Sequence, residues 1–426
     1  MVNSKRLAEN FNRLSTIGAQ EHGGITRIAF TDPDWEARAY VIQIMEQAGL
    51  CIHMDAFGNI IGRREGRNPD APVVMLGSHI DSVPDGGNFD GVAGVLGAIE
   101  VMQCLEDEAA AFYHPIEVVV FMAEESSRFG VATLGSKVFC GKIKMNELEQ
   151  FVDQQGVSLS EALTQRNLGA GKSAQAGYTG EIKSFLELHI EQGKVLETVG
   201  KRLGIVTGIA APTRMRLIVT GQADHSGATP MHMRHDALTA AAEIILSVEK
   251  LAEGLSQDGI VGTTGIVHAE PGVMNVIPGR VELGIDIRGT VLAAKQLMLS
   301  QLQEAIDRMK NRRQVDVEIM VLTDEKPVAL SAEMQEFLQS LCDEHNMPVL
   351  HMPSGAGHDA MHMAEITHTG LVFIPCRAGI SHNPAEWAEL ADIVSGVELL
   401  LAAVRKLAQK DFVWKTAVPA YGTNNA

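Results

Sequence analysis

Short apolar segments that end abruptly in polar, ligand-type side chains constrain the fold most strongly. The apolar run at 73–76 leads into GSHIDS, the run at 116–123 leads into EESSRFG, and the run at 185–188 leads into HIEQG. Buried strands of a doubly wound sheet end in this way at their carboxyl edge, where such folds place their sites. Helical stretches at 92–106 and 147–155 lie between them. We therefore expect a layered α/β domain built on a doubly wound mixed sheet.

A second pattern begins near residue 212. Its expected elements are a strand at 213–221, a helix at 235–253, strands at 261–270 and 279–289, a helix at 292–310 and a strand at 314–324. This β-α-β-β-α-β order is the ferredoxin-like unit. The first pattern then returns, with helices expected over 331–345 and 390–407. We predict a discontinuous large domain over 1–211 and 325–416, an inserted domain over 212–324 and a frayed tail over 417–426.

Composition narrows the possible partners. The 426 residues carry 35 Lys and Arg against 53 Asp and Glu, a formal charge of −18. This surplus repels polyphosphate, so nucleic acid and anionic membranes are not expected partners. The five cysteines are dispersed without a CxxC pair, which favours reduced thiols. With no signal-peptide core and no apolar run long enough to span a membrane, we expect a cytoplasmic protein.

Several familiar catalytic and binding motifs are incomplete or missing. The string GAGKS at 169–173 lacks the first glycine of a phosphate-binding loop, because Arg166 occupies that position. Neither GxSxG nor HExxH occurs in the chain. The glycines at 91, 94 and 97 lie in an apolar helical stretch, and we interpret them as packing residues. Nucleotide binding and serine-nucleophile chemistry are therefore not expected.

Histidines and carboxylates gather instead at the predicted ends of the strands. Taken singly, each such residue is more often a solvated loop side chain than a ligand. Strand ends that meet at one sheet edge change that interpretation, and the residues concerned are His79, Asp81, Asp90, Glu124, Glu125, His189 and His382. Imidazole and carboxylate ligands without thiolate suit Zn, Mn, Co or Ni, and a bridging carboxylate can join two ions. We therefore predict two divalent metal ions per subunit, with different tasks for the adjacent Glu124 and Glu125.

Five ordered motifs together resemble a known family. The strings GSHIDSVPDGGNFDG, FMAEESSRFG, ELHIEQG, GHDA and GISHNPAEW are similar to those of the binuclear amidases of the peptidase M20 clan, in the hydantoinase/carbamoylase branch. The resemblance runs from about residue 5 to about residue 410. That branch contains N-carbamoyl-L-amino-acid hydrolases, allantoate amidohydrolases and β-ureidopropionases. The resemblance implies that the inserted domain is a lid and dimerisation domain, and hence that the chain forms a homodimer.

The resemblance also implies roles for individual residues. The metal ligands would be His79, Asp90 as the bridge, Glu125, His189 and His382. Glu124 would be the general base, and the carboxylate of Asp81 would orient His79. In the inserted domain, His225 would serve as an electrophilic or oxyanion group. The implied substrate-binding positions are Gln192, His225, Asn275, Arg288, Gly357 and His358, and Arg288 would grip a substrate carboxylate through its planar fork.

The sequence departs from the family pattern at three positions. Ala123 stands where many relatives carry an acidic residue, Ser126 where they carry glycine, and His235 where they often carry arginine. None of these changes removes an expected ligand. We therefore expect hydrolysis of the ureido C–N bond of an N-carbamoyl-L-amino acid, a small-molecule carboxylate substrate, to give the amino acid, carbon dioxide and ammonia. The alternatives are an allantoate amidohydrolase, a β-ureidopropionase, an M20 dipeptidase or acylase, and a binding protein on an inactive scaffold.

Overall fold

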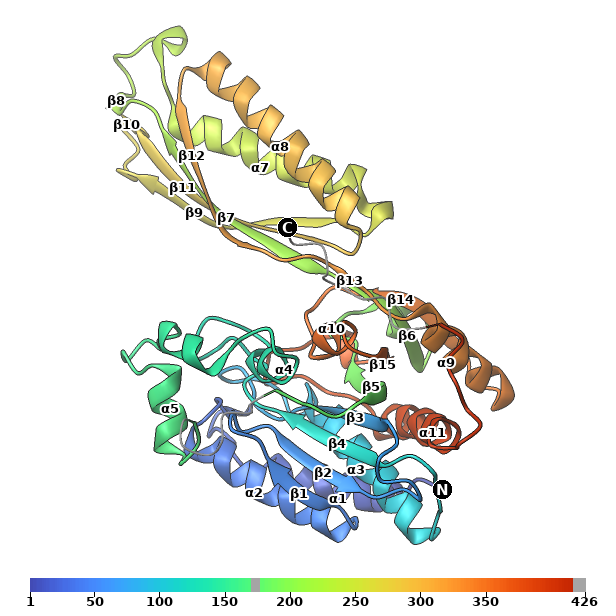
Figure 1. The fold of residues 1–426 in the computed structure, drawn as a ribbon. Helices are drawn as coiled ribbons and strands as arrows, with labels where there is room; N and C mark the ends of the chain where they lie inside the picture. Colours follow the sequence, from blue (N-terminus) through green and yellow to red (C-terminus); the bar gives the residue numbers. More distant parts are fainter. Residues whose placement is uncertain (170–176, 417–426) are drawn as a thin grey trace. The chain divides into compact units, whose positions relative to one another are not determined.

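The computed structural model describes residues 1–169 and 177–416, and the chain divides into two compact units (Figure 1). Unit 1 contains Met1–Thr207, Leu330–Met352 and the chain from Gly357 onward. Unit 2 contains Gly208–Ala329 and the short segment Pro353–Ala356. The borders expected from the sequence, 211/212 and 324/325, fall inside β7 (Ala211–Thr220) and directly after β12 (Asp316–Asp324). Residues 170–173 of the GAGKS string and the tail 417–426 lie outside the described residues.

Most strands of a large mixed sheet belong to the first unit. Its strand order is β1-β2-β4-β3-β5-β15-β6-β13, and β14 pairs with β6. The strands are β1 (Cys51–Met54), β2 (Ile60–Arg64), β3 (Val73–His79), β4 (Ile116–Phe121), β5 (Ile182–Ile190), β6 (Leu203–Ile209), β13 (Val328–Ala329), β14 (Val349–Ser354) and β15 (His368–Ile374). The central strands β4, β3, β5 and β15 run parallel. Their carboxyl ends therefore meet at one edge, as the apolar runs predicted.

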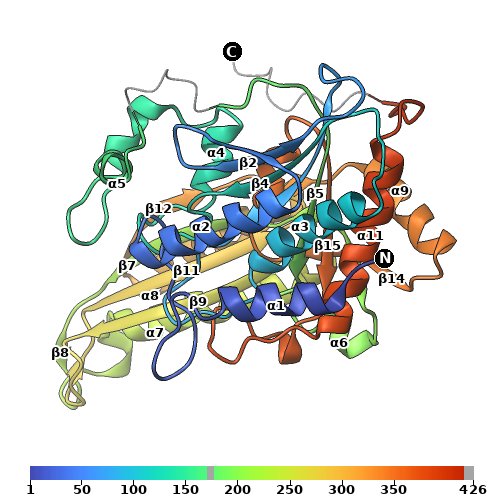
Figure 2. The ribbon, with the colours of Figure 1, turned by 90° about the horizontal axis from the view of Figure 1, so that it is seen from below.

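Five helices share one hydrophobic core with this sheet, and Figure 2, drawn from the side of these helices, shows α1, α2 and α3 in front. They are α1 (Ser4–Leu14), α2 (Asp32–Gln47), α3 (Val92–Asp107), α9 (Ala332–Glu344) and α11 (Leu390–Leu407). Their apolar side chains form a single core with inward residues of the strands, such as Leu76, Leu188 and Val372. A Cβ atom on Gly94 would lie 2.4 Å from the carbonyl oxygen of Leu188. The packing role predicted for Gly94 is therefore confirmed.

The helix expected over 147–155 is wrong. The chain forms a 3₁₀ helix there, η1 (Met145–Gln150), which ends at Phe151 in an extended conformation. The side chain of Asp153 then accepts hydrogen bonds from the backbone N–H groups of Gln155 and Val157. Such a side chain offers the backbone a turn in place of a helix. The remaining short helices of the unit are α4 (Leu134–Phe139), α5 (Leu159–Gln165), α6 (Val195–Val199), α10 (Ala360–Met363) and η4 (Arg377–Gly379).

Unit 2 is a ferredoxin-like sandwich. Its four-stranded antiparallel sheet has the order β12-β7-β11-β9. The remaining elements are β8 (Asp224–His225), η2 (Met231–Met233), α7 (Ala237–Gly254), η3 (Ser256–Asp258), β9 (Val261–Glu270), β10 (Val276–Ile277), β11 (Arg280–Gly289) and α8 (Leu292–Arg313). Alternate residues of β11, including Leu283 and Ile287, are buried in a core shared with α7 and α8. The predicted fold class, a doubly wound mixed sheet with a ferredoxin-like insertion, is confirmed.

Within the described residues, no helix combines the length and the apolar character needed to cross a membrane.

Candidate metal centre

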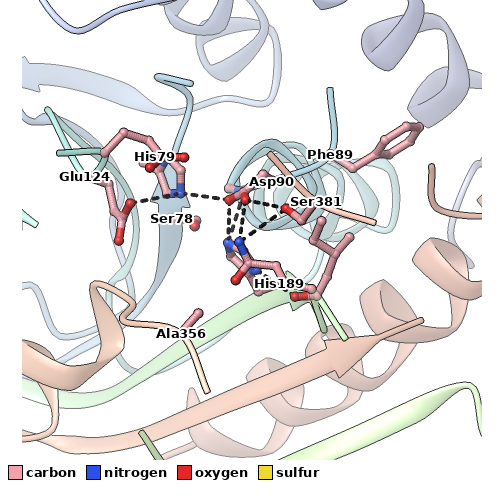
Figure 3. A network of polar contacts seen from close by, with 12 residues as sticks. Ser78, His79, Phe89, Asp90, Glu124, His189, Ala356 and Ser381 are labelled. Atoms are coloured by element: carbon pink, nitrogen blue, oxygen red, sulfur yellow. Dashed lines mark hydrogen bonds and ion pairs between the residues drawn. The ribbon is translucent and has the colours of Figure 1, made fainter. Parts of the chain in front are cut away.

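The carboxyl ends of the parallel strands bring the predicted ligands together in unit 1 (Figure 3). His79 is the last residue of β3, and His189 lies near the end of β5. Asp90 lies just before α3, Glu125 follows β4, and His382 follows β15. These side chains approach one another within hydrogen-bonding or ion-pair distance. The convergence expected from strand ends at one sheet edge is what the structure shows.

Asp90 is shared by two groups of ligand-type atoms. Its Oδ1 lies 3.1 Å from His189 Nε2 and 3.4 Å from His79 Nε2. Its Oδ2 lies 3.2 Å from His382 Nε2, which is itself 3.3 Å from Glu125 Oε1. Each oxygen of one carboxylate thus faces a different group. This is the arrangement that a bridging carboxylate needs between two ions.

The donor atoms fit divalent ions of the zinc class. In the groups His79–Asp90–His189 and Asp90–Glu125–His382, the ligand atoms lie within 4.8 Å of one another. All of them are imidazole nitrogens or carboxylate oxygens, which suit Zn, Mn, Co or Ni. The backbone also leaves space for the imidazole. A Cβ atom on Gly91, whose φ is +64°, would lie 2.4 Å from His79 Nε2.

The electrostatics of the cluster favour positive charge. Burial lowers the pKa of His79, but the nearby carboxylates of Glu124, Asp81 and Asp90 raise it well above its ordinary value. Hydrogen bonds to Asp90 and Glu125 raise the pKa of His382 to about 11. Burial raises the pKa of Asp90, but His189, His382 and His79 hold it well below its ordinary value. Asp90 thus retains its negative charge, which would stabilise cations placed on either side of it.

Glu124 is buried beside the ligands and lies in a constrained turn. Its Oε2 is 3.8 Å from His79 Nε2. Burial raises the pKa of its carboxyl group well above the ordinary value, with a further contribution from the charge of Glu125. The preceding residue, Ala123, has a left-handed φ of +55°, and the backbone N–H groups of Thr133 and Leu134 donate to the carbonyls of Glu124 and Ala123. A buried carboxyl group with a raised pKa suits a general acid and base.

Asp81 holds this turn more closely than it holds the histidine. Its Oδ1 accepts the N–H of Glu124 at 3.2 Å, and its Oδ2 accepts the N–H of Glu125 at 3.0 Å. His79 Nδ1 lies 3.1 Å from the main-chain carbonyl of Asp81 and 3.6 Å from Oδ1 of its carboxylate. A ring N–H donated to that carbonyl leaves Nε2 free to bind a metal. The carbonyl of Asp81 is therefore the closer partner of His79.

Three further predicted residues of unit 1 lie at or behind the cluster. The side-chain Nε2 of Gln192 donates to Asp90 Oδ2 at 2.6 Å, and the residue has a left-handed φ of +56°. His358 is 2% exposed, with its ring centroid 4.5 Å from that of His189 and 5.5 Å from that of Phe373. Gly357 directly precedes it in the chain. Gln192 thus contacts a candidate ligand directly, whereas His358 packs behind one.

The remaining predicted residues belong to unit 2. The strand pair β8–β10 joins His225 to Val276, and the N–H of Ser226 donates to the carbonyl of Asn275 at 3.0 Å. His225 Nδ1 accepts the N–H groups of Gly227 at 3.0 Å and Ala228 at 3.2 Å. Because Nδ1 is an acceptor here, the ring proton is on Nε2. The exposed side chain of His225 thus presents an N–H donor, as an oxyanion-binding group requires.

Arg288 already has acidic and carbonyl partners in unit 2. Its guanidinium contacts both carboxylate oxygens of Asp286, at 3.1 Å and 3.2 Å. Its third nitrogen donates to the carbonyl of Gly355 at 3.0 Å. The fork is thereby fixed in orientation, and a substrate carboxylate would share it with Asp286.

Sequence reasoning missed several polar residues around the cluster. Ser381 Oγ lies 3.0 Å from Asp90 Oδ2, and the buried carboxylate of Glu386 contacts the backbone of Asp90. Buried Glu187 accepts hydrogen bonds from Ser78 Oγ and from the N–H of Ala360. All three missed residues lie inside motifs that the sequence singled out, GISHNPAEW and ELHIEQG. Glu187 and Glu386 differ from ordinary loop and strand residues by their burial, and Ser381 by its contact with Asp90.

The departures from the family pattern leave the ligands in place. Ala123 is buried and packs with Phe57 and Met122 in a second hydrophobic cluster. The carbonyl of Ser126 accepts the N–H of Gly130, and the carbonyl of His235 accepts the N–H of Gln222. These residues therefore shape loops and do not occupy ligand positions.

Comparisons with known proteins agree over nearly the whole chain. The model of peptidase family M20/M25/M40 matches residues 75–406. An N-carbamoyl-L-amino acid amidohydrolase of Geobacillus stearothermophilus is 40% identical over 410 residues, which cover 96% of this chain and 100% of that relative. An allantoate amidohydrolase of Escherichia coli is 35% identical over 404 residues, covering 94% and 97%. Among solved structures, an amidase of the hydantoinase/carbamoylase family from Burkholderia multivorans has a TM-score of 0.91 at 35% identity, covering 96% and 98%.

Proposed function

Since the chain belongs to peptidase family M20/M25/M40, we propose that it is a metal-dependent amidohydrolase acting on N-carbamoyl-L-amino acids. It would cleave the ureido C–N bond and release the amino acid, carbon dioxide and ammonia. The observation that supports this most directly is the shared position of Asp90, whose two oxygens face two separate ligand groups. We choose N-carbamoyl-L-amino acids as the substrate class because relatives that are 40% identical are N-carbamoyl-L-amino-acid amidohydrolases.

The candidate ligands would hold two divalent ions, with Zn, Mn, Co and Ni as the candidate metals. One ion would take His79 and His189, the other Glu125 and His382, and both would take Asp90. When bound, the ions would supply Lewis acidity toward the carbamoyl carbonyl and would lower the pKa of water.

Glu124 would carry the proton in this reaction. Its carboxylate would accept a proton from the attacking water and return it to the leaving nitrogen. The raised pKa of this buried group supports that role, because a carboxyl group transfers protons best when its pKa lies near the working pH. Its backbone is held by Asp81 and Thr133, so that the side chain keeps one approach to the cluster.

We propose that unit 2 contributes substrate-binding groups. The Nε2–H of His225 would donate to the developing oxyanion, and Arg288 would bind the substrate carboxylate. Asn275, tied to the His225 turn through its carbonyl, would add an amide contact. In unit 1, the side chain of Gln192 would also bind the substrate. We also propose that the active protein is a homodimer.

Ammonia release tests the proposal. Metal-stripped protein would be reconstituted with Mn²⁺ or Zn²⁺ and assayed on a panel of N-carbamoyl-L-amino acids and, in parallel, on allantoate. Metal-dependent turnover of the carbamoyl panel is the expected result. Turnover that is unchanged by complete removal of the metal contradicts the proposal.

The similarity to an allantoate amidohydrolase favours allantoate as the second candidate substrate. Allantoate also combines a ureido group with a carboxylate, so the same residues would serve. Turnover of allantoate alone in the parallel assay would replace the carbamoyl substrate by allantoate and leave the residue roles unchanged.

A further inference from the structure

Glu386 is a buried carboxylate next to the candidate metal centre that the proposed reaction does not use. It is 4% exposed. Its Oε1 accepts the backbone N–H groups of Phe89 at 2.9 Å and Asp90 at 3.1 Å. Its Oε2 accepts the hydroxyl of Ser381 at 2.9 Å. One side chain therefore holds both the segment that carries Asp90 and the segment that carries His382.

Ser381 extends this hold to the bridging side chain. Its Oγ lies 3.0 Å from Asp90 Oδ2 (Figure 3). The same oxygen lies 3.2 Å from His382 Nε2. The main chain of Asp90 is thus held by Glu386. The hydroxyl of Ser381 lies between the two carboxylates and donates its single proton either to Asp90 Oδ2 or to Glu386 Oε2. Both contacts lead back to the carboxylate of Glu386.

The surrounding backbone is shaped to admit this carboxylate. A Cβ atom on Gly87 would lie 2.1 Å from Glu386 Oε1, so only glycine fits there. Glu386 itself lies in a turn, in which its N–H donates to the carbonyl of Asn383 at 3.0 Å. Burying a carboxylate is costly unless its hydrogen bonds are satisfied, and here two backbone N–H groups and the shared hydroxyl of Ser381 satisfy them.

His382 depends most on such a support. Its side chain is 49% exposed, whereas the side chains of His79 and His189 are almost fully buried. Packing therefore constrains His382 least among the three histidines. A link between its segment and Asp90 would restrict the positions that its ring can reach.

We infer that Glu386 is a positioning residue of the metal centre, which joins the Asp90 and His382 segments and so sets the spacing of the two ligand groups. The inference rests on the proposed function, because it presupposes that the two groups hold ions. Groups that orient metal ligands in this way typically change metal affinity or activity by about 10–100-fold when they are removed.

The test measures metal binding rather than turnover. Metal-stripped wild-type protein, E386A, E386Q and E389A would be titrated with Mn²⁺ and followed by electron paramagnetic resonance. The signal of free Mn²⁺ gives the affinity of each ion, and the exchange-coupled signal of a Mn²⁺ pair reports a shared bridge. Glu389 is the matched control, because it lies in the same segment but is 60% exposed and pairs with Arg377.

Wild-type protein and E389A are expected to bind two ions and to show the coupled signal. E386A is expected to bind the second ion about 10–100-fold more weakly and to lose that signal. E386Q is expected to keep most of the coupled signal, because its amide oxygen can still accept the backbone N–H groups of Phe89 and Asp90. If E386A fails to fold, S381A tests the same link, with a weakened second ion as the expected result.

Two outcomes distinguish a failure of this inference from a failure of the proposed function on which it rests. If folded E386A, or S381A in its place, matches E389A in both affinities and in the coupled signal, the inference is overturned and the proposed function stands. If the wild-type protein binds no Mn²⁺ and metal analysis finds no bound Zn²⁺, Co²⁺ or Ni²⁺ after reconstitution with each, the proposed function is overturned, and the inference with it.

Discussion

The carboxylate of Asp81 accepts the backbone N–H of Glu124 at 3.2 Å. Its other oxygen accepts the N–H of the next residue, Glu125, at 3.0 Å. One side chain at the end of β3 thus holds the turn after β4 in which the proposed general base and a candidate ligand are neighbours. The orientation of both carboxylates depends on this contact between two adjacent strands.

Replacing Asp81 with asparagine should disturb that turn. The amide has one acceptor oxygen, so its NH₂ group would face one of the two backbone N–H groups. We expect D81N to lose about 10–100-fold in metal affinity or in turnover. Steady-state kinetics and metal analysis would measure the loss. D85N is the control, because Asp85 is in the following loop and half-exposed; equal behaviour of the two variants would contradict the assigned role.

Glu124 and Glu125 should respond differently to the same substitution. E124Q removes the proton carrier but none of the candidate ligands, so we expect full metal content and a kcat lowered by about 10²–10⁴-fold. E125Q removes a carboxylate from the second ligand group, so we expect weaker binding of one ion. Metal analysis of both variants together with kcat measurements distinguishes the roles. Normal turnover of E124Q would show that another group carries the proton.

Gly91 should tolerate no side chain. In G91A the new Cβ atom would lie 2.4 Å from His79 Nε2, and we expect the variant to lose metal binding. Gly130 is a matched control, because its φ is also positive, at +72°, and its added Cβ atom would meet no atom within 4 Å. G130A should cost about 1–2 kcal/mol from backbone strain alone and keep its metal. Metal content and thermal unfolding measure both effects, and metal-replete G91A would contradict the predicted clash.

Lys183 should make stability depend on alkaline pH. Burial lowers the pKa of its ammonium group from 10.5 to about 8, although Asp411 opposes the shift. The amine donates to the carbonyl of Leu407 at 2.8 Å and lies 2.9 Å from His114 Nε2. Between pH 8 and 10.5 the unfolded chain therefore binds more protons than the folded chain. The free energy of unfolding gains a contribution that rises with pH across this window.

K183M should lack that contribution. Thermal unfolding at pH 8 and at pH 10 would show a less favourable change in Tm with rising pH for K183M than for the wild type. K5M, at an exposed lysine of α1, should behave as the wild type does. If Tm changed equally with pH in K183M and in the wild type, the pKa of Lys183 would not be lowered by folding.

The pattern of apolar and polar residues along short segments determined most of the strands and helices, and short motifs determined the family. Each apolar run that ended in ligand-type residues is a buried strand, and the strand at 261–270 and the helix at 390–407 have the predicted ends. The motifs identified the M20 family, and the family match confirms it. They also placed His79, Asp90 and His189 at one sheet edge. Strand and helix periodicity are properties of about ten consecutive residues, which is why the sequence alone reveals them.

Only the tertiary structure decided how these residues are held. In place of the helix expected over 147–155, the chain forms a turn in which the side chain of Asp153 accepts backbone N–H groups. The segment Pro353–Ala356 joined unit 2, although the chain on both sides of it belongs to unit 1. Glu386 contacts the backbone of Asp90 across 296 positions of the chain, and Ser381 contacts its carboxylate across 291. No local pattern encodes such contacts, because they depend on where the packed sheet places the two segments.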